Sequence, residues 1–343
     1  MLKSNKFIQN RFQVLESLIG NTPMVGIEYR YKRRKGTIFV KCEHYNYTGS
    51  IKDRMALCIL SEAYRKQTIH AGNHIVEVTS GNTGISMAAL GRSLGHPVSI
   101  IMPDWMSKER KDIIRSLGAA IIEVSKEQGG FVRGLQIADE MAAASSNIFL
   151  PNQFSNSDNV LAHNMNTGVE IFCQLLNINL LPKAFVAGVG TGGTIMGVNK
   201  LLRSMCRDVK IHPLEPAESP TLTTGYKIGT HRIQGISDEF IPAILKLDQL
   251  DEVVQVSDGD AILMAQKLAS TFGMGVGISS GANLVGAIKL QKKYGFNSVV
   301  ATVFADCNKK YLSTDLLKDE PIKDNYLSPD VELLDFFTLE RAY

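Results

Sequence analysis

The sequence predicts an α/β protein with two open, twisted, mostly parallel sheets that are flanked by helices. Short apolar segments of strand character alternate with helical segments, first up to about residue 150 and then again up to residue 304. Such alternation is typical of parallel strands joined by right-handed helical crossovers. The chain has 343 residues, of which 44% are hydrophobic, so it can form one large domain or two closely joined domains.

The first set of elements follows a polar lead-in and a short helix within residues 1–20. A turn at residues 20–25 leads into an extended segment, and a second polar break lies at residues 71–73. In chain order we expect strand 37–42, helix 52–66, strand 74–79, helix 85–94, strand 98–102, helix 108–117, strand 120–124 and helix 134–144.

The second set repeats the same alternation. Residues 217–245 are irregular and rich in glycine, proline and hydroxyl side chains, so we interpret them as functional loops. From residue 314 the chain is polar, and its apolar piece 333–337 is expected to dock on a surface. The expected elements are helix 164–176, strand 184–187, helix 195–206, strand 210–216, strand 253–256, helix 258–272, helix 281–294 and strand 298–304.

Composition excludes several classes of function. A net charge of +3 gives no reason to expect nucleic acid or an anionic membrane as a partner. The five cysteines are scattered without a CxxC pair, which argues against a zinc site or a disulfide framework. The sequence shows neither a secretory signal nor an apolar run long enough for a membrane helix. We therefore expect a cytoplasmic protein with small molecules or other protein chains as partners.

Residues 46–54 (NYTGSIKDR) place Lys52 beside small residues at the expected start of a helix. Thr48 or Ser50 can cap this helix, whose free N–H groups create a positive end. A lysine buried there is shifted toward the neutral amine, which can condense with an aldehyde. The alternative is an exposed lysine on a capped surface helix.

The glycine-rich stretch 188–194 (GVGTGGT) follows a strand and precedes a helix. Its bare backbone can approach an anion closely while the helix N-terminus favours negative charge, so the stretch predicts a phosphate site. A dinucleotide fingerprint would place its third glycine at Gly193, but no clear ribose-binding acid follows the next strand. A tight turn without a ligand is the other alternative.

Two further turns have the same shape. Residues 79–84 (TSGNTG) are rich in donors, which suits a carboxylate at the start of a helix, although an ordinary capped turn accounts for them equally well. Residues 277–282 (GISSGA) place Ser279 where its hydroxyl can meet a ring nitrogen, although a simple N-cap is the alternative.

Taken in this order, the four motifs resemble the cysteine synthase and cystathionine β-synthase family of pyridoxal-phosphate enzymes, of fold type II or the tryptophan-synthase-β class. The resemblance runs from about Leu15 to Asp315. It implies a cofactor, pyridoxal 5'-phosphate, in the cleft between two domains. The smaller domain would comprise residues 47–156, the larger one residues 1–46 and 157–315, and residues 316–343 would form a tail.

The resemblance also implies roles for individual residues. Lys52 would be the Schiff-base lysine, Asn82 would contact the ring hydroxyl, and Ser279 would face the pyridine nitrogen. The phosphate would be bound by Gly190, Thr191, Gly192, Gly193 and Thr194. The substrate would be held by Thr79, Ser80, Gly81, Thr83, Gln153 and Gly235.

The implied chemistry is β-replacement on a serine- or cysteine-like amino acid. Lys52, once displaced by the substrate, would remove the α-proton, and a neutral Ser279 would favour β-elimination over transamination or racemisation. We expect a cysteine synthase that makes L-cysteine and acetate from O-acetyl-L-serine and sulfide. Alternatives are a lyase that releases hydrogen sulfide from L-cysteine, a cystathionine β-synthase-like activity, and an inactive relative that binds a partner. The family implies a homodimer, with a serine acetyltransferase-type protein as a further partner.

Four residues depart from the family pattern or extend it. Tyr47 stands where relatives commonly have proline, and either faces the site or lies on the surface. Asp238 and Glu239, in residues 234–242 (QGISDEFIP), stand where cysteine synthases usually have small residues. These acids would repel hydrosulfide and could activate water or attract an ammonium group, unless they form a solvated loop tip. Asp306 is a further acid near the pocket, with no expected role beyond a hydrogen bond.

Overall fold

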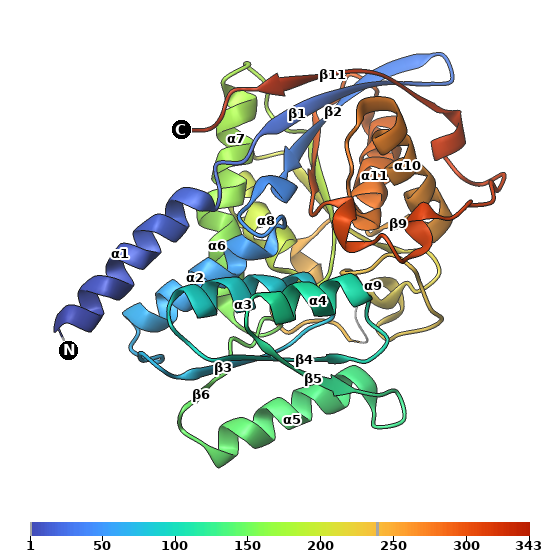
Figure 1. Ribbon diagram of the computed structural model, residues 1–343. Helices are drawn as coiled ribbons and strands as arrows, with labels where there is room; N and C mark the ends of the chain where they lie inside the picture. The colour runs from blue at the N-terminus through green and yellow to red at the C-terminus, as the bar shows by residue number, and fades with distance from the viewer. Residues whose placement is uncertain (1, 238–239) are drawn as a thin grey trace.

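The computed structural model describes residues 2–237 and 240–343 and contains two sheets (Figure 1). The smaller sheet has the strand order β5-β4-β3-β6, and every neighbouring pair in it is parallel. Its strands are β3 (His74–Val78), β4 (Val98–Pro103), β5 (Ala120–Val124) and β6 (Ile148–Phe149).

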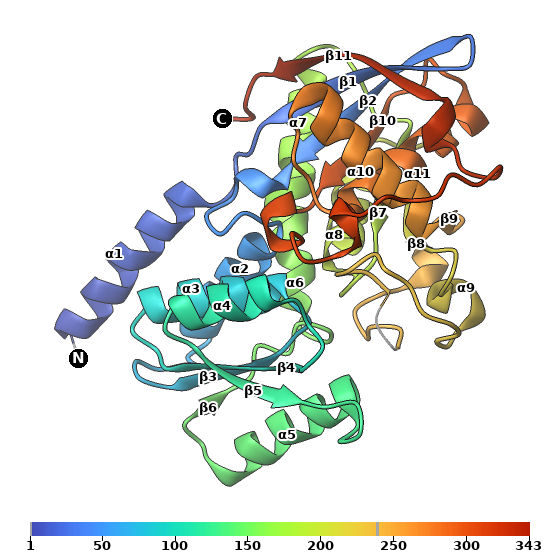
Figure 2. The ribbon, with the colours of Figure 1, turned by 45° about the vertical axis from the view of Figure 1, so that its right-hand side comes forward.

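Helices cover both faces of the smaller sheet. Ile75 and Ile100 point to one face and share a core cluster with residues of helices α1 to α4. Val76 and Ile101 point to the other face and share a second cluster with Phe131. This alternation is the period of two that a strand imposes on its side chains. The helices are α2 (Lys52–Arg65), α3 (Asn82–Ser93) and α4 (Lys108–Ser116) on one face and α5 (Gly130–Ala144) on the other (Figures 1 and 2).

The larger sheet has the order β11-β1-β2-β10-β7-β8-β9. Strand β1 is antiparallel to both of its neighbours, and the remaining pairs are parallel. The strands are β1 (Met24–Tyr31), β2 (Arg34–Cys42), β7 (Ala184–Gly188), β8 (Lys210–Pro216), β9 (Val254–Val256), β10 (Val300–Phe304) and β11 (Val331–Leu339).

The larger sheet also lies between helices. Side chains of α10 and α11 share one core cluster with Ile38 and Val186, and side chains of α7 and α8 share another with Phe39 and Phe185. The helices of this part are α6 (Ser157–Ala162), α7 (Gly168–Leu176), α8 (Gly193–Met205), α9 (Thr221–Thr224), α10 (Asp258–Phe272) and α11 (Ile278–Tyr294). Helix α1 (Leu2–Leu18) lies at one side of the molecule, and its Ile8, Phe12 and Leu15 belong to the core cluster that contains residues of α2 and α3 (Figure 1).

The predicted α/β class with mostly parallel sheets is confirmed, and the differences lie at particular elements. The expected helix 164–176 consists of two segments, a π-helical turn at His163–Thr167 and then α7, and the turn directly follows α6. The apolar piece 333–337 lies within β11, which pairs with β1. None of the described helices combines the length and apolar character that crossing a bilayer requires.

A buried ion cluster fixes the helix that carries Lys52. Arg54 donates from Nε to Glu43 Oε2 and from Nη1 to Glu170 Oε1, each at 2.6 Å. Lys41 Nζ lies 2.7 Å from Glu170 Oε2. At most 1% of each of these four side chains is exposed. The cluster joins β2, the segment that follows it, α2 and α7, and its two positive charges balance its two negative ones.

The geometry of the cluster explains its protonation. Burial alone raises the pKa of Glu170, but hydrogen bonds from Arg54, the charges of Arg54 and Lys41, and the Lys41 hydrogen bond hold that pKa at about 2. Burial likewise raises the pKa of Glu43, and the charge and hydrogen bond of Arg54 reverse the shift and lower it. Removing Arg54 would therefore leave two carboxylates buried without their main partner.

We predict that Arg54→Met destabilises the protein by about 3–5 kcal/mol, because breaking a buried ion network leaves uncompensated charge. The measurement is the urea midpoint of unfolding. Arg65→Met is the matched control, since Arg65 lies on the same helix and pairs with Glu62 while 68% of its side chain is exposed. We expect the control to unfold like the wild type, and equal midpoints for both variants would refute the role of the cluster.

Candidate active site

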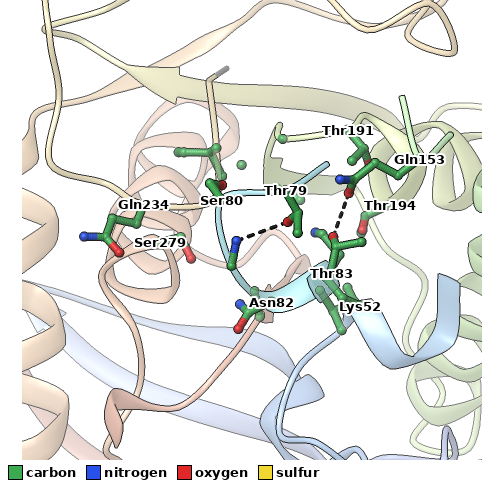
Figure 3. A pocket seen from close by; sticks show the side chains of 18 of the residues that line it. Lys52, Thr79, Ser80, Asn82, Thr83, Gln153, Thr191, Thr194, Gln234 and Ser279 are labelled. Carbon is green, nitrogen blue, oxygen red and sulfur yellow. Dashed lines mark hydrogen bonds between the residues drawn. The ribbon is translucent and has the colours of Figure 1, made fainter. Parts of the chain in front are cut away.

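One pocket lies where the carboxyl ends of strands from both sheets meet. The turn after β3 supplies Thr79 to Thr83, and the turn after β7 supplies Gly190, Thr191 and Thr194. Lys52 and Ser279 lie at the starts of α2 and α11. Open parallel sheets commonly bind ligands at this edge, because successive loops converge there. Figure 3 shows the side chains pointing into a common space.

Most residues singled out in the sequence line this pocket. Gly192 and Gly193 do not line it but form the turn into α8. Asp238 and Glu239 lie outside the described residues. Tyr47 is 49% exposed and is not part of the lining. The predicted residues that line the pocket are Lys52, Thr79, Ser80, Gly81, Asn82, Thr83, Gln153, Gly190, Thr191, Thr194, Gly235 and Ser279.

In the glycine-rich turn, the positions of Gly190 and Gly193 have no room for a side chain. A Cβ on Gly190 would lie 2.5 Å from the carbonyl oxygen of Gly235, and one on Gly193 would lie 1.8 Å from Asn159 Oδ1. Gly192 has φ 87°, the left-handed region that favours glycine. The first N–H groups of α8 have no partner within the helix, so the turn offers backbone donors to an anion.

A buried histidine that is not part of the pocket lining contacts this turn. His163, in the π-helical turn, lies with Nε2 3.4 Å from Thr194 Oγ1 and Nδ1 2.9 Å from Thr167 Oγ1. Burial lowers its pKa well below the usual value, and the charges of Arg54 and Lys52 lower it further. The imidazole is therefore neutral and acts as a hydrogen-bonding support beside Thr194. π-Helical turns frequently occur at functional sites.

The turn after β3 is held by side-chain hydrogen bonds. Thr79 Oγ1 accepts from the Gly81 N–H at 3.1 Å, and Thr83 Oγ1 donates to Gln153 Oε1 at 2.6 Å (Figure 3). Gln153 Nε2 donates to the Val78 carbonyl at 2.7 Å, which fixes the orientation of its amide. The turn therefore presents an ordered set of backbone and hydroxyl groups at the start of α3, as a carboxylate ligand requires.

The start of α2 differs from the predicted cap. Ile51 occupies the N-cap position without a side-chain capping bond. Ser50 Oγ accepts from the Lys52 N–H at 3.3 Å, which is the only part of the expected capping that is present. Thr48 instead donates from its backbone and its hydroxyl to Asp53. Asp53 in the first turn of the helix therefore attaches the preceding Thr48 to α2 without capping it, and burial raises the pKa of Asp53 against these hydrogen bonds.

Sequence reasoning missed Arg110, which also lines the pocket. Arg110 is 2% exposed, and its Nε and Nη1 have no hydrogen-bond partner among the described residues. A Cβ on Gly81 would lie 2.6 Å from Nε, so the glycine makes room for the guanidinium. The available signal was its place in α4, directly after β4, because parallel pairing brings that turn to the same edge of the sheet as Thr79.

The remaining lining residues were given no individual role in the sequence analysis. They are Ile51, Phe154, Ala187, Gly188, Gln234, Ile236, Asn283, Val303 and Ala305. Among the residues that the structure describes, no group of three or more histidine, cysteine, aspartate or glutamate side chains is arranged to hold a metal ion.

Comparison with known proteins identifies the class. Residues 15–306 match the family described as pyridoxal-phosphate-dependent enzymes, and the chain belongs to this family. The protein is therefore an enzyme that uses pyridoxal phosphate. The site fits this cofactor, because a glycine-rich turn at a helix N-terminus suits its phosphate, and the buried Asn82 Oδ1 still lacks a partner among the described residues.

Individual relatives show which pyridoxal-phosphate-dependent enzymes this chain is similar to. Cysteine synthase B of Campylobacter jejuni is 42% identical over 88% of this chain and 97% of that protein. The crystal structure of a hydrogen sulfide-producing enzyme from Fusobacterium nucleatum is 55% identical, covers 96% of this chain and 99% of its own, and has a TM-score of 0.93. A variant of a hydrogen sulfide-producing enzyme with an aspartate changed to asparagine, 54% identical with the same coverage and TM-score, was solved with a reaction intermediate bound.

Glu77 is a buried carboxyl group in β3, two residues before the turn that begins at Thr79. Its Oε1 accepts from the Val78 N–H at 2.9 Å, while Oε2 has no hydrogen-bond partner among the described residues. Burial raises its pKa to about 8, although backbone hydrogen bonds from Val78 and Gln153 oppose the shift. The folded protein thus holds a proton at Glu77 that the unfolded chain releases near its ordinary pKa of 4.5.

We predict that Glu77→Gln removes a pH dependence of stability. The contribution of the protonated carboxyl is fully present below pH 4.5 and is lost as pH rises toward about 8, with a slope of at most about 1.4 kcal/mol per pH unit. Between pH 5 and pH 8 the thermal midpoint of the variant should therefore rise relative to that of the wild type.

Glu332→Gln is the control, because 58% of that side chain is exposed. Its midpoints should follow the wild type across the same range. Parallel curves for Glu77→Gln and the wild type would show that Glu77 is already ionised in the folded protein.

Proposed function

We propose that the protein catalyses β-replacement on L-cysteine with release of hydrogen sulfide. With water as the nucleophile, L-cysteine and water give L-serine and hydrogen sulfide, and a second amino acid or thiol can replace the water. The observation that carries this proposal is the 55% identity, over 96% of the chain, to a hydrogen sulfide-producing enzyme. This similarity moves the sulfide-releasing alternative ahead of the cysteine synthase expected first.

The acids of residues 234–242 also favour the release of sulfide over the synthesis of cysteine. Ser237 N–H donates to the Val189 carbonyl at 2.7 Å, so the segment that ends at Ser237 is attached beside the glycine-rich turn. Asp238 and Glu239 follow it directly in the sequence. Carboxylates repel hydrosulfide, which disfavours the synthetic direction, and can accept a proton from water. We propose Asp238 as the residue that activates the nucleophile, with Glu239 as the second candidate.

The other residues of the pocket have roles that follow from their positions. When bound, pyridoxal phosphate supplies an electron sink for the α-carbon of the amino acid. We propose that the turn of residues 190–194 holds its phosphate and that Lys52 holds its aldehyde carbon. The amine of Lys52, once released, accepts the α-proton. Ser279 offers a neutral hydroxyl toward the ring nitrogen.

The substrate would be held by its carboxylate at the start of α3. The residues proposed for this role line the pocket together, namely Thr79, Ser80, Gly81 and Thr83 of the turn, Gln153, which is bonded to Thr83, and Gly235. This arrangement fixes the α-carbon near Lys52, which lines the same pocket. Catalysis would thus depend on positioning the amino acid and on one amine that moves a proton.

A cysteine synthase is the second candidate, supported by the 42% identity to cysteine synthase B. Cystathionine β-synthase-like turnover, with a thiol amino acid as the nucleophile, uses the same residues. An inactive relative that binds a partner peptide is disfavoured, because Lys52, Asn82 and Ser279 all line the pocket.

We further propose a homodimer in the cytoplasm. Phe7, Val14 and Leu18 are each at least 46% exposed on α1, which suits burial against a second copy. All five cysteines are free, as expected in a reducing compartment. A serine acetyltransferase-type protein remains the proposed further partner, by family resemblance.

The test is a product analysis with L-cysteine alone, L-cysteine plus homocysteine, and O-acetyl-L-serine plus sulfide. We predict hydrogen sulfide and L-serine from L-cysteine alone, at a higher kcat/KM than cysteine formation from O-acetyl-L-serine. Asp238→Asn should lower serine formation at least about 100-fold, the size of a general-base contribution, and slow α-proton exchange in deuterated water far less.

Two results would count against the proposal. Cysteine formation without any sulfide release would establish the synthase instead. Equal loss of serine formation and of α-proton exchange in Asp238→Asn would show that Asp238 does not act on the nucleophile. Glu239→Gln is the matched comparison for the neighbouring acid.

A further inference from the structure

Asp306 is a fully buried acid at the end of β10 that the reaction described above does not use. Its Oδ2 accepts two hydrogen bonds, from Asn82 Nδ2 at 2.7 Å and from the Tyr311 hydroxyl at 2.7 Å. Its Oδ1 has no hydrogen-bond partner among the described residues. The acid thus contacts Asn82, one of the pocket residues, from behind.

The backbone at Asp306 joins three segments of the site. Asp306 pairs with Ser50 in an isolated bridge, and the Ile51 N–H donates to the neighbouring Ala305 carbonyl at 2.9 Å, just before Lys52. The Gly277 N–H donates to the Asp306 carbonyl at 3.1 Å, just before Ser279. Together with its side-chain bond to Asn82, Asp306 therefore touches the segments that carry Lys52, Ser279 and Asn82.

The fit around the carboxyl group is close. A Cβ on Gly277 would lie 2.1 Å from Asp306 Oδ1, so this position has room only for glycine. Tyr311 is 1% exposed, and the Arg110 guanidinium lies 4.8 Å from the centre of its ring. Burial and then the charge of Asp306 raise the pKa of Tyr311 well above its usual value, so the phenol stays protonated and donates. Asp306 is thus closely packed between Asn82, Gly277 and Tyr311.

An amide side chain has two chemically different ends, and a carboxylate distinguishes them. Because Asp306 can only accept, it requires the nitrogen of Asn82 and not the oxygen to face it. One hydrogen of that nitrogen is used, and the other is left for a second acceptor. Without the carboxylate, the amide could present either end to its surroundings.

We propose that Asp306 is a positioning residue that fixes the orientation of the Asn82 amide, so that Asn82 donates its second N–H to the ring oxygen of the cofactor. The charge-assisted bond from Asn82 to Asp306 supplies the orientation, and the hydrogen bond from Tyr311, whose ring packs against Arg110, holds the acid in place. The inference concerns the resting enzyme and is independent of which nucleophile the enzyme uses.

The test is the absorbance spectrum of the bound cofactor without substrate. A donor to the ring oxygen stabilises its ionised form, which absorbs in the visible, over the neutral form, which absorbs in the near ultraviolet. We predict that Asp306→Asn lowers the ratio of the visible to the near-ultraviolet band by about fivefold, the effect of losing one ordinary hydrogen bond. Asn82→Ala should lower it by a similar factor.

Two further variants separate orientation from packing. Tyr311→Phe removes the other hydrogen bond to the same oxygen but leaves the bond from Asn82, so its ratio should change less than twofold. The double variant Asp306→Asn with Asn82→Ala should match Asn82→Ala alone, because Asp306 acts through Asn82. Should Asp306→Asn fail to fold, Asp306→Ser removes the carboxylate with a smaller side chain and serves the same comparison.

An unchanged ratio in a folded Asp306 variant, with a changed ratio in Asn82→Ala, would overturn the proposal. Additive effects in the double variant would overturn it equally, because they would show that Asp306 acts by another route. Neither result bears on the release of sulfide from L-cysteine, so the failure of this inference is distinguishable from the failure of the proposed function.

Discussion

The ion pairs between Arg54 and two buried glutamates fix the helix turn that carries Lys52, the lysine for which a catalytic role is proposed. Arg54 is two residues after Lys52 on α2, and its bonds to Glu43 and Glu170 attach the first turn of that helix to the larger sheet and to α7. On the other side of Lys52, Ile51 is bonded to Ala305 at the end of β10. A lysine that must hold a cofactor and then move a proton needs such a fixed backbone, because the reacting atoms have to stay within hydrogen-bond reach.

The remainder of the site follows from parallel strands. Each turn at the carboxyl edge precedes a helix, so each presents free N–H groups, and the two sheets bring several such turns to one space. The same construction gives the turns before α8 and α3, for which phosphate and carboxylate binding are proposed, their similar chemistry. Asp306 follows β10 of the larger sheet and contacts Asn82 on α3, so the proposed ring contact depends on both parts of the chain.

Much of this organisation could be predicted from the sequence. The turns containing Lys52, Asn82 and Ser279 are recognisable there, because glycine and hydroxyl residues at the start of successive helices are typical of turns that bind anions. The contacts of Arg110 and of Asp306 could not be predicted, because they join segments far apart in the chain and depend on side-chain directions. Local propensity predicts a hydroxyl cap for α2, but the hydroxyl of Thr48 donates to Asp53, which also accepts from Ser86 on the next helix.

The most direct measurement of whether Lys52 holds the cofactor is chemical. Reduction of the resting enzyme with borohydride fixes the cofactor to the amine that holds it, and digestion with mass spectrometry then identifies the peptide. The account predicts the tag on Lys52 alone, with trypsin failing to cleave there. A tag on Lys41 or Lys310, the buried lysines nearest in the chain to Lys52 and to Asp306, or no tagged peptide at all, would contradict it.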